Sequence, residues 1–247
     1  MDLNRFITPR RQKGFTLVEL LIVVGIIALL VGILMPVLRR TREAAASVVC
    51  MSNLRQISLG TMYYAQANRD YYPGPALRSG PGVPEFQHDW IWWKATSKHS
   101  ADFSKSPIVP YLGQNANSKV LICPSDAIFR TNTFAGDPPF PFSYTLNAWL
   151  TGILATPRYS VSHTTLQVKN ASKTIMFAEE DERCLNDGTF DSRFDWVGIR
   201  HDRDRVTPDT FQAANMTRKG NVSFCDGHVE SVTRSFAHDP LNYDPAK

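Results

Sequence analysis

The stretch FTLVELLIVVGIIALLVGILMPVL occupies residues 15–38, and Glu19 is its only charged side chain. As a helix rising about 1.5 Å per residue it would be roughly 36 Å long, enough to cross a hydrocarbon core of about 30 Å with some tilt. Basic side chains stand on both sides of it: Arg5, Arg10, Arg11 and Lys13 before it, and Arg39, Arg40 and Arg42 after it. The stretch therefore predicts one membrane-spanning helix near the N-terminus.

Glu19 is unusual in this context. A carboxylate at the centre of a membrane helix costs roughly 2.5–3.5 kcal/mol on insertion scales, and such residues commonly mark functional sites. Two interpretations remain open. Glu19 lies in the first turns of the span, where its side chain can reach the lipid headgroups, or it pairs with a cation supplied by another chain.

A short basic leader ends at Gly14, and Phe-Thr-Leu-Val-Glu follows at once as residues 15–19. This arrangement resembles the processing site of type IV prepilins and type II secretion pseudopilins. The resemblance implies that a membrane peptidase, the prepilin peptidase, cuts between Gly14 and Phe15 and then methylates the new amine of Phe15. It also implies that Glu19 faces the N-terminal amine of a neighbouring subunit in a filament.

An ordinary secretory signal peptide is the competing interpretation of this segment. Such a peptide has an apolar region of about 7–15 residues, followed by a small-residue cleavage site. Here the apolar run is longer, and Leu34-Met35-Pro36-Val37 offers no such site. Cleavage before the span, at Gly14, would leave the mature chain anchored.

The charge of the chain is concentrated in the leader. The formal charge of the 247 residues is +4, and residues 1–14 carry a net +3 of it, which leaves about +1 for the rest. This favours a topology signal over a nucleic-acid-binding surface, so no nucleic-acid partner is predicted. Cations before the span favour a cytoplasmic leader, whereas Arg39, Arg40 and Arg42 favour the reverse. The resemblance implies a cytoplasmic leader, a single-pass anchor in the inner membrane and a periplasmic C-terminal domain, which would become extracellular in a filament.

The helix is expected to continue beyond the span. Pro36 removes a helical hydrogen bond and should kink or locally unwind the chain. After it, apolar or small residues recur at steps of three and four, which predicts an amphipathic continuation over 39–70 that packs on a domain of residues 71–247. The residues of this stripe are Ala44, Val48, Met51, Leu54, Ile57, Thr61 and Tyr64.

Short alternating or apolar runs in the remaining chain predict strands. They lie at 119–123, 142–147, 173–178, 195–199, 221–225 and 228–232. Asp226-Gly227 between the last two favours a hairpin with a type I′ turn. The expected fold class is α+β: a pilin-like lollipop, with a long N-terminal helix packed on an antiparallel sheet with long loops.

Several positions resemble landmarks of one pilin-like family of planctomycete-type bacteria, named for a His, nine residues and Asp-Gly near the C-terminus. They include Cys50, 53–57, Cys123-Pro124, Ser143-Tyr144, Asn147 and 224–229. Arg200-His201 is similar to the histidine segment of that family. However, 24 residues separate His201 from Asp226, so 202–215 look like an insertion.

Four cysteines, an even number, suit an oxidising compartment and allow three disulfide connectivities. We expect Cys50–Cys123, since the first lies on the amphipathic helix and the second ends a predicted strand; Cys184–Cys225 is the second pair. Buried free thiols are the alternative. No pair has CxxC spacing, so a zinc knuckle is not expected.

Two groups of side chains are candidate metal ligands. His201, Asp202, Asp226 and His228 could meet at one end of the sheet and hold a divalent metal ion. A cluster of carboxylates could hold Ca²⁺ instead; it consists of Glu179, Glu180, Asp181, Asp187 and Asp191. The competing interpretations are a turn residue for Asp226, a hairpin flank for His228 and a solvated loop for the acidic run.

No catalytic residues are predicted. The sequence has no GxSxG elbow and no glycine-rich phosphate loop. We therefore expect a structural subunit, with the prepilin peptidase, other pilin or pseudopilin subunits and membrane lipid as partners. The alternative is a monomeric, membrane-tethered binding module or surface enzyme. In that case the aromatic residues of 90–93 would form a saccharide platform, although packing of these residues in the core is the simpler interpretation.

Overall fold

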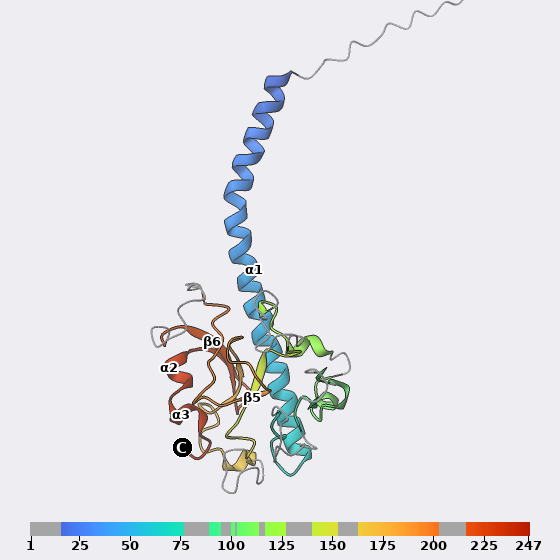
Figure 1. Cartoon of the computed structure of the whole chain (residues 1–247), viewed down its shortest axis with the longest axis vertical. Helices are drawn as coiled ribbons and strands as arrows, with labels where there is room; N and C mark the ends of the chain where they lie inside the picture. Colours follow the sequence, from blue (N-terminus) through green and yellow to red (C-terminus); the bar gives the residue numbers. More distant parts are fainter. Residues whose placement is uncertain are drawn as a thin grey trace, which may run out of the picture. The chain divides into compact units, whose positions relative to one another are not determined.

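The computed structural model describes residues 16–76, 89–94, 100–101, 103–113, 117–126, 140–152, 163–202 and 216–247 (Figure 1). Its longest element is helix α1, Leu17–Ala67, of 51 residues. The chain divides into two units, Met1–Arg42 and Glu43–Lys247, which are described separately below.

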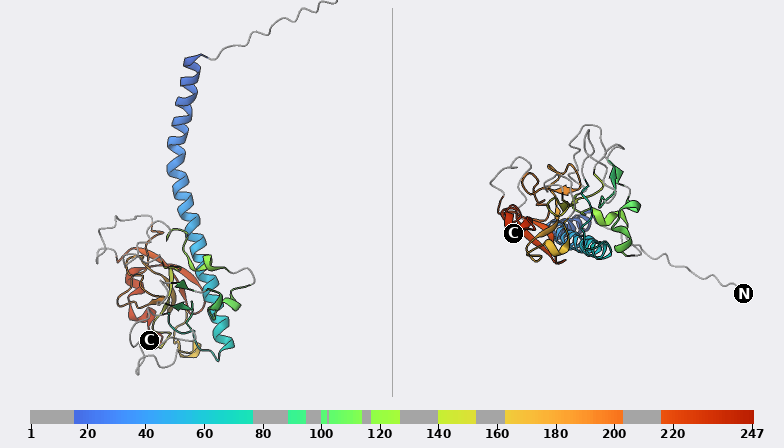
Figure 2. Two further views of the ribbon diagram at one scale, coloured as in Figure 1. Left: turned by 45° about the vertical axis from the view of Figure 1, so that its right-hand side comes forward. Right: turned by 90° about the horizontal axis from the view of Figure 1, so that it is seen from below.

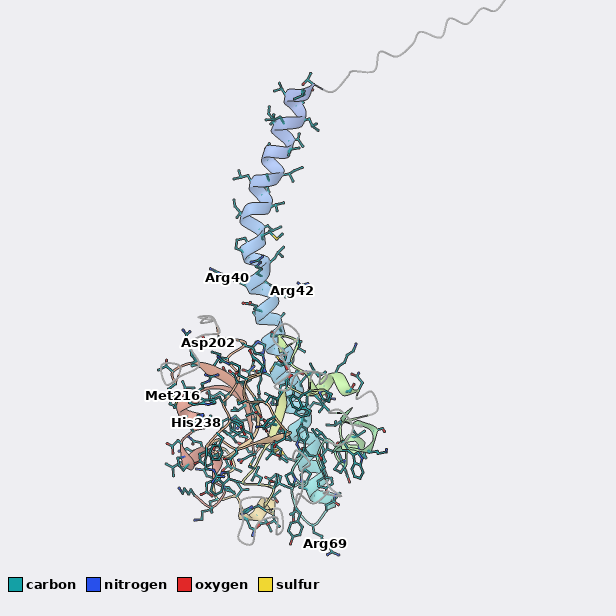
Figure 3. All side chains as sticks on the ribbon, in the orientation of Figure 1. Arg40, Arg42, Arg69, Asp202, Met216 and His238 are labelled. Carbon is teal, nitrogen blue, oxygen red and sulfur yellow. The ribbon has the colours of Figure 1, made fainter. Side chains whose placement is uncertain are left out.

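The first part of α1 exposes its apolar side chains. Those from Leu17 to Leu38 are 45–78% exposed, and an 18-residue window here has a mean hydropathy of 3.1 with none of it buried. By length and composition this helix can cross a membrane. It stays helical on both sides of Pro36, so the predicted local unwinding is absent from this structure, and a kink stays a prediction. The sticks of Figure 3 show Arg40 and Arg42 projecting from this part of α1.

The second part of α1 belongs to the C-terminal unit and buries one face. Cys50, Leu54, Ile57, Thr61 and Tyr64 are buried at steps of four and three, as one helix face requires. The predicted stripe is therefore confirmed from Leu54 onward.

At its N-terminal end the predicted stripe was wrong. Ala44 and Val48 are exposed, because the buried face of α1 begins only at Cys50. The helix ends at Ala67, and Arg69 and Asp70 then take left-handed φ values of 56° and 63° that turn the chain away.

A five-stranded sheet forms the centre of the C-terminal unit. Its order is β5-β3-β4-β6-β7, and neighbours are antiparallel except for the parallel pair β3–β5. The strands are β3 Tyr144–Asn147, β4 Ile175–Glu179, β5 Thr189–Phe190, β6 Lys219–Phe224 and β7 Val229–Thr233. A separate hairpin pairs β1 Trp93–Lys94 with β2 Ser100–Ala101. The predicted α+β class, a long helix with a mostly antiparallel sheet, is confirmed.

The remaining described elements are short. The 3-10 helices are η1 Phe103–Lys105, η2 Val109–Tyr111, η3 Ser118–Leu121 and η5 Thr165–Gln167, and the chain closes with α2 Arg234–Ala237 and α3 Pro240–Tyr243. Strands β6 and β7 and helices α2 and α3 have the orange-red to red colours of the C-terminal end of the chain in Figure 2.

Two predicted strands were wrong. Residues 119–123 lie in or after η3, because the Asn117 side chain accepts a hydrogen bond from the Lys119 amide and starts a helical turn. Residues 195–199 make a single bridge, between Val197 and Glu180, and no strand.

The predicted hairpin between β6 and β7 is present, but its turn is not type I′. Such a turn needs positive φ at both central residues, and here Gly227 alone has it, at 86°. The Gly227 amide donates to the Phe224 carbonyl over 2.8 Å, and the Phe224 amide donates to the His228 carbonyl over 3.0 Å. The loop therefore holds three residues, 225–227, with the glycine taking the left-handed position.

The core lies where α1 meets the sheet and the 90–91 segment. Leu54 and Ile57 share one hydrophobic cluster with Trp90 and Phe177, and the last two rings pack edge-on with centroids 5.0 Å apart. The Trp90 indole donates to the Gly188 carbonyl over 2.7 Å. Trp90 and Ile91 are 0% exposed, so they are core residues and cannot serve as a saccharide platform.

Candidate functional site

The N-terminal segment is described from Thr16 onward, so Gly14 and Phe15 lie outside the described residues. Thr16 and Glu19 bond reciprocally. The Thr16 amide and hydroxyl donate to Glu19 Oε2 over 2.9 and 2.8 Å, and the Glu19 amide donates to Thr16 Oγ1 over 3.2 Å. This is a capping box, in which two side chains satisfy amides that the first helical turn leaves unpaired.

The capping box gives Glu19 a role within its own chain. A carboxylate is also favoured at the positive end of the helix dipole. Sequence analysis missed this role, although the Thr-x-x-Glu spacing that signals it stands at residues 16–19. Both bonds that Glu19 accepts end on Oε2, which leaves Oε1 without a donor among the described residues.

Four potential metal ligands meet in the buried part of the C-terminal unit. Cys50 comes from α1, Cys123 follows η3, Glu179 ends β4 and His201 lies in the loop before the 203–215 segment. Their ligand atoms all lie within 4.8 Å of one another. Cys50 Sγ is 3.2 Å from Glu179 Oε2, Cys123 Sγ is 3.2 Å from His201 Nε2, and that nitrogen is 3.6 Å from Glu179 Oε1.

The protonation states of this cluster are interdependent. Burial, together with the neighbouring Cys123 and Glu179, raises the pKa of the Cys50 thiol well above its usual value. Hydrogen bonding with Cys50, and then with His201, lowers the pKa of Cys123 against the effect of burial. Burial alone would lower the pKa of His201, but its contacts with Cys123 and Glu179 raise it overall. Cys123 is therefore the thiol of the pair that ionises more readily.

Arg200 is the cation beside the cluster. Its guanidinium lies 3.1 Å from Glu179 and 3.2 Å from both Asp126 and Glu182, and its side chain is 1% exposed. Burial opposes its charge, but these carboxylates prevail and raise the pKa of Arg200 further. The guanidinium therefore stays charged and offsets the buried acids.

The acidic run that begins at Glu179 was predicted as a solvated loop, and this was wrong. Glu179, Glu180 and Asp181 are at most 1% exposed. Buried arginines provide the reason: Arg200 binds Glu179, and Arg234 lies 2.5 Å from Asp181. Neither pairing was visible in the sequence.

Glu180, Cys184 and Asp195 form a second group whose ligand atoms lie within 4.8 Å of one another. Burial, with nearby carboxylates, raises the pKa of Asp195 to about 7 and that of Glu180 well above its usual range. Burial and the charges of Glu180 and Asp181 also raise the pKa of Cys184. This group therefore favours protonated side chains near neutral pH.

The predicted metal ligands do not assemble as expected. His201 lies with Cys50, Cys123 and Glu179, whereas Asp226 and His228 pair with each other at the hairpin, 2.6 Å apart. The His228 ring also stacks on Phe224, with centroids 4.1 Å apart.

Two of the carboxylates proposed for calcium, Asp187 and Asp191, have separate protein partners. Asp187 accepts from the Thr189 amide and Asp191 pairs with Arg193. Asp202, which was predicted to join His201, Asp226 and His228, instead accepts from the Lys219 amide over 2.9 Å. Within the described residues these side chains brace turns and strands.

All four cysteines are free thiols in the structure, so neither predicted disulfide is present. Cys50 and Cys123 are nevertheless neighbours in the four-residue cluster. Cys184 instead lies beside Trp196, whose amide donates to its sulfur over 3.1 Å.

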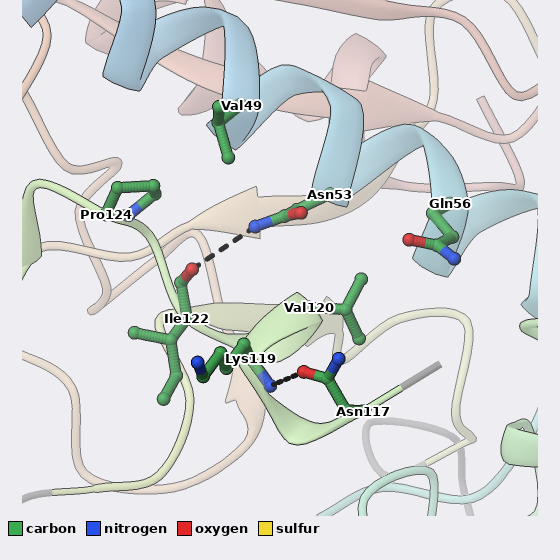
Figure 4. Close-up of a pocket in the computed structure, with 8 residues that line it drawn as sticks. All are labelled: Val49, Asn53, Gln56, Asn117, Lys119, Val120, Ile122 and Pro124. Atoms are coloured by element: carbon green, nitrogen blue, oxygen red, sulfur yellow. Dashed lines mark hydrogen bonds between the residues drawn. The ribbon is translucent and has the colours of Figure 1, made fainter. Parts of the chain in front are cut away.

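A pocket of about 480 Å³ lies between α1 and residues 117–124 (Figure 4). The Asn53 amide group crosses one end of it and donates to the Ile122 carbonyl over 3.2 Å. The pocket is lined by Val49, Asn53, Gln56, Asn117, Lys119, Val120, Ile122 and Pro124. Lys119 is the sole titratable residue of this lining, so the pocket offers no acid–base pair.

A family model for the prokaryotic N-terminal methylation motif matches residues 9–35. No curated protein and no solved structure matches the chain. The match covers the segment around Gly14 and the apolar part of α1. Together with that exposed apolar helix it indicates a chain with a prepilin-type signal, anchored in a membrane through its N-terminal region. The resemblance of the C-terminal region to the His-to-Asp-Gly family stays a prediction.

Proposed function

We propose that this chain is a filament subunit of the prepilin class. It is made as a precursor, cut between Gly14 and Phe15 by a prepilin peptidase, and methylated at the amine of Phe15. The mature chain is held in the inner membrane by the first part of α1 and polymerises through that helix into a type IV pilus-like filament or a type II secretion pseudopilus.

One observation carries this proposal: the methylation motif at residues 9–35 coincides with a helix whose apolar side chains are exposed. Exposed apolar surface of this extent needs lipid or other apolar helices around it. A filament subunit uses both environments in turn, lipid before assembly and neighbouring helices after it.

Two features of the described part of the C-terminal unit are consistent with a structural role. Of the 90–93 segment that would support a saccharide-binding module, Trp90 and Ile91 are buried and Trp92 is half-buried, whereas the Trp93 side chain lies outside the described residues. The pocket beside α1 lacks an acid–base pair. The C-terminal unit then serves as the part of the subunit outside the membrane, in the periplasm or on the filament surface.

The cleavage step is tested by Gly14→Val in cells that contain a prepilin peptidase. A side chain at the cut blocks the close approach of the backbone that glycine permits, so the variant should remain full length while the unmodified chain matures to an N-terminus at Phe15. N-terminal mass spectrometry measures both. Gly25→Val is the matched control, because a Cβ at Gly25 meets nothing within 4 Å, and it should be cut normally. A mature N-terminus at Phe15 in Gly14→Val would refute the processing assignment.

A further inference from the structure

The cluster of Cys50, Cys123, Glu179 and His201 lies apart from the N-terminal segment and has no part in the proposed function. Its members come from a helix, two loops and a strand end that are distant in sequence. Each contributes one ligand atom, and the four atoms lie within 4.8 Å of one another. We propose that these residues bind one divalent transition-metal ion, zinc by the chemistry of the donors, as a structural centre.

The spacing of the donor atoms suits zinc. Zinc bonds of about 2.0–2.3 Å in a tetrahedron set neighbouring ligand atoms roughly 3.3–3.8 Å apart. Two spacings within the ligand set lie next to this range: 3.2 Å from Cys50 Sγ to Glu179 Oε2, and 3.2 Å from Cys123 Sγ to His201 Nε2. The other spacings are at most 4.8 Å, so the four atoms can close around one ion with side-chain shifts of about 1 Å or less.

The donor types suit zinc better than calcium or magnesium. Two thiol sulfurs and an imidazole nitrogen are soft or borderline ligands, whereas calcium and magnesium prefer oxygen alone. Four protein ligands complete a tetrahedral shell, which is typical of structural rather than catalytic zinc. Cys50, Cys123 and Glu179 are 0% exposed and the His201 side chain is 4% exposed, so the site is closed to solvent as a structural centre requires.

Neighbouring groups hold the ligands in place and balance the charge. Two thiolates, one carboxylate and a zinc ion sum to one negative charge. The Arg200 guanidinium, 3.1 Å from Glu179 Oε1, is a buried positive charge beside the site, which Glu179 shares with Asp126 and Glu182. That contact occupies Oε1 and leaves Oε2, the atom nearest Cys50, for the metal. The Asn221 amide donates to Cys50 Sγ over 3.4 Å, a bond that stabilises a thiolate ligand.

The centre would fasten α1 to the sheet. Cys50 is the first buried residue of α1, and Glu179 ends the central strand β4. Because such a site exists only in the folded chain, metal binding adds directly to the stability of the fold.

The test uses the full chain, purified in detergent with its thiols reduced and exposed to zinc chloride. After desalting, elemental analysis should find about one zinc per chain, falling below roughly one tenth in Cys50→Ser and Cys123→Ser. Cys184→Ser and Cys225→Ser are the matched controls, since neither sulfur is in the cluster, and both should retain zinc. Retention of zinc by Cys50→Ser, or less than about one tenth of a zinc on the unmodified chain, would overturn the proposal.

A second measurement, the cobalt spectrum of the unmodified chain, does not depend on the folding of any variant. Cobalt(II) in the place of zinc on the unmodified chain should give a sulfur-to-cobalt charge-transfer band in the near ultraviolet and intense visible bands of tetrahedral cobalt. His201→Gln, a polar replacement, should weaken cobalt binding by at least about tenfold. A spectrum without the charge-transfer band, or a Cys50–Cys123 disulfide in chain isolated from cells with its thiols trapped at lysis, would show that the two sulfurs do not serve a metal.

Discussion

Helix α1 has two parts with the same backbone conformation and opposite environments. Between Leu17 and Leu38 the large apolar side chains are 45–78% exposed. Beyond Glu43 the helix is amphipathic, and Leu54 and Ile57 are fully buried in the core of the C-terminal unit.

This difference shows that two segments of one helix can be stabilised by different surroundings. The first part has apolar residues all round and gains nothing from water, so its environment must be lipid or other apolar helices. The second part is stabilised by packing of one face, as helices of globular proteins are. Substitutions in the first part should therefore change filament assembly, whereas substitutions in the second part should change the free energy of unfolding of the C-terminal unit.

The largest effect is expected for Glu19→Ala in the first part. Under the proposed function, assembly pairs this carboxylate with the Phe15 amine of a neighbour, and removing one partner of a buried ion pair costs about 3–5 kcal/mol. Processing and insertion should persist, because the variant makes the span more apolar. Sheared filaments should fall sharply while membrane-bound monomer accumulates. Glu19→Asp should be intermediate, since its charge remains but its reach is shorter. A filament yield from Glu19→Ala equal to that of the unmodified chain would show that Glu19 has no role in assembly.

The next effect is expected in the second part. Leu54 is 0% exposed, and Leu54→Ala should lower the free energy of unfolding of the C-terminal unit by about 2–5 kcal/mol, because it opens a cavity in the core. Leu30, at 61% exposed, is the matched control, and Leu30→Ala should change this stability by less than about 0.5 kcal/mol. Urea titration of the full chain in detergent, followed by tryptophan fluorescence, measures both. If both variants lowered the free energy of unfolding equally, the two parts of α1 would not differ in their contribution to the stability of the C-terminal unit.

The smallest effect is expected for Thr16→Ala, which removes both cap bonds of the Thr16 hydroxyl but keeps the Glu19 carboxylate. Loss of such a cap costs about 0.5–2 kcal/mol. Amide hydrogen exchange in micelles should speed up in the first turn of α1 and nowhere in the C-terminal unit. Filament yield should stay near that of the unmodified chain. A loss of filaments as large as that of Glu19→Ala would mean that Glu19 acts through the cap and not through a neighbouring subunit.

The local features of the chain could be predicted from the sequence. A long apolar run, here with Glu19 as its one charged residue, specifies a spanning helix, because its apolar residues need no particular partner. The stripe from Leu54 to Tyr64, the strands at β3, β4, β6 and β7, and the 226–227 turn position follow from periods of 3.6 and 2 and from turn residues. The Thr16–Glu19 cap was also within reach, since it depends on a spacing of three residues.

The buried polar chemistry could not be predicted this way, because it joins residues that only the fold brings together. Glu179 and its acidic neighbours have the composition of a solvated loop, yet Glu179 and Asp181 are buried against Arg200 and Arg234, which reach them from elsewhere in the chain. The absence of a CxxC motif argued against zinc, yet Cys50, Cys123, Glu179 and His201 meet from four separate elements. The sequence alone determined the membrane-spanning helix and the prepilin-type signal, which depend on local composition and order. Only the tertiary structure decided which charges and thiols became neighbours, because such contacts depend on the packing of distant segments and leave no local pattern.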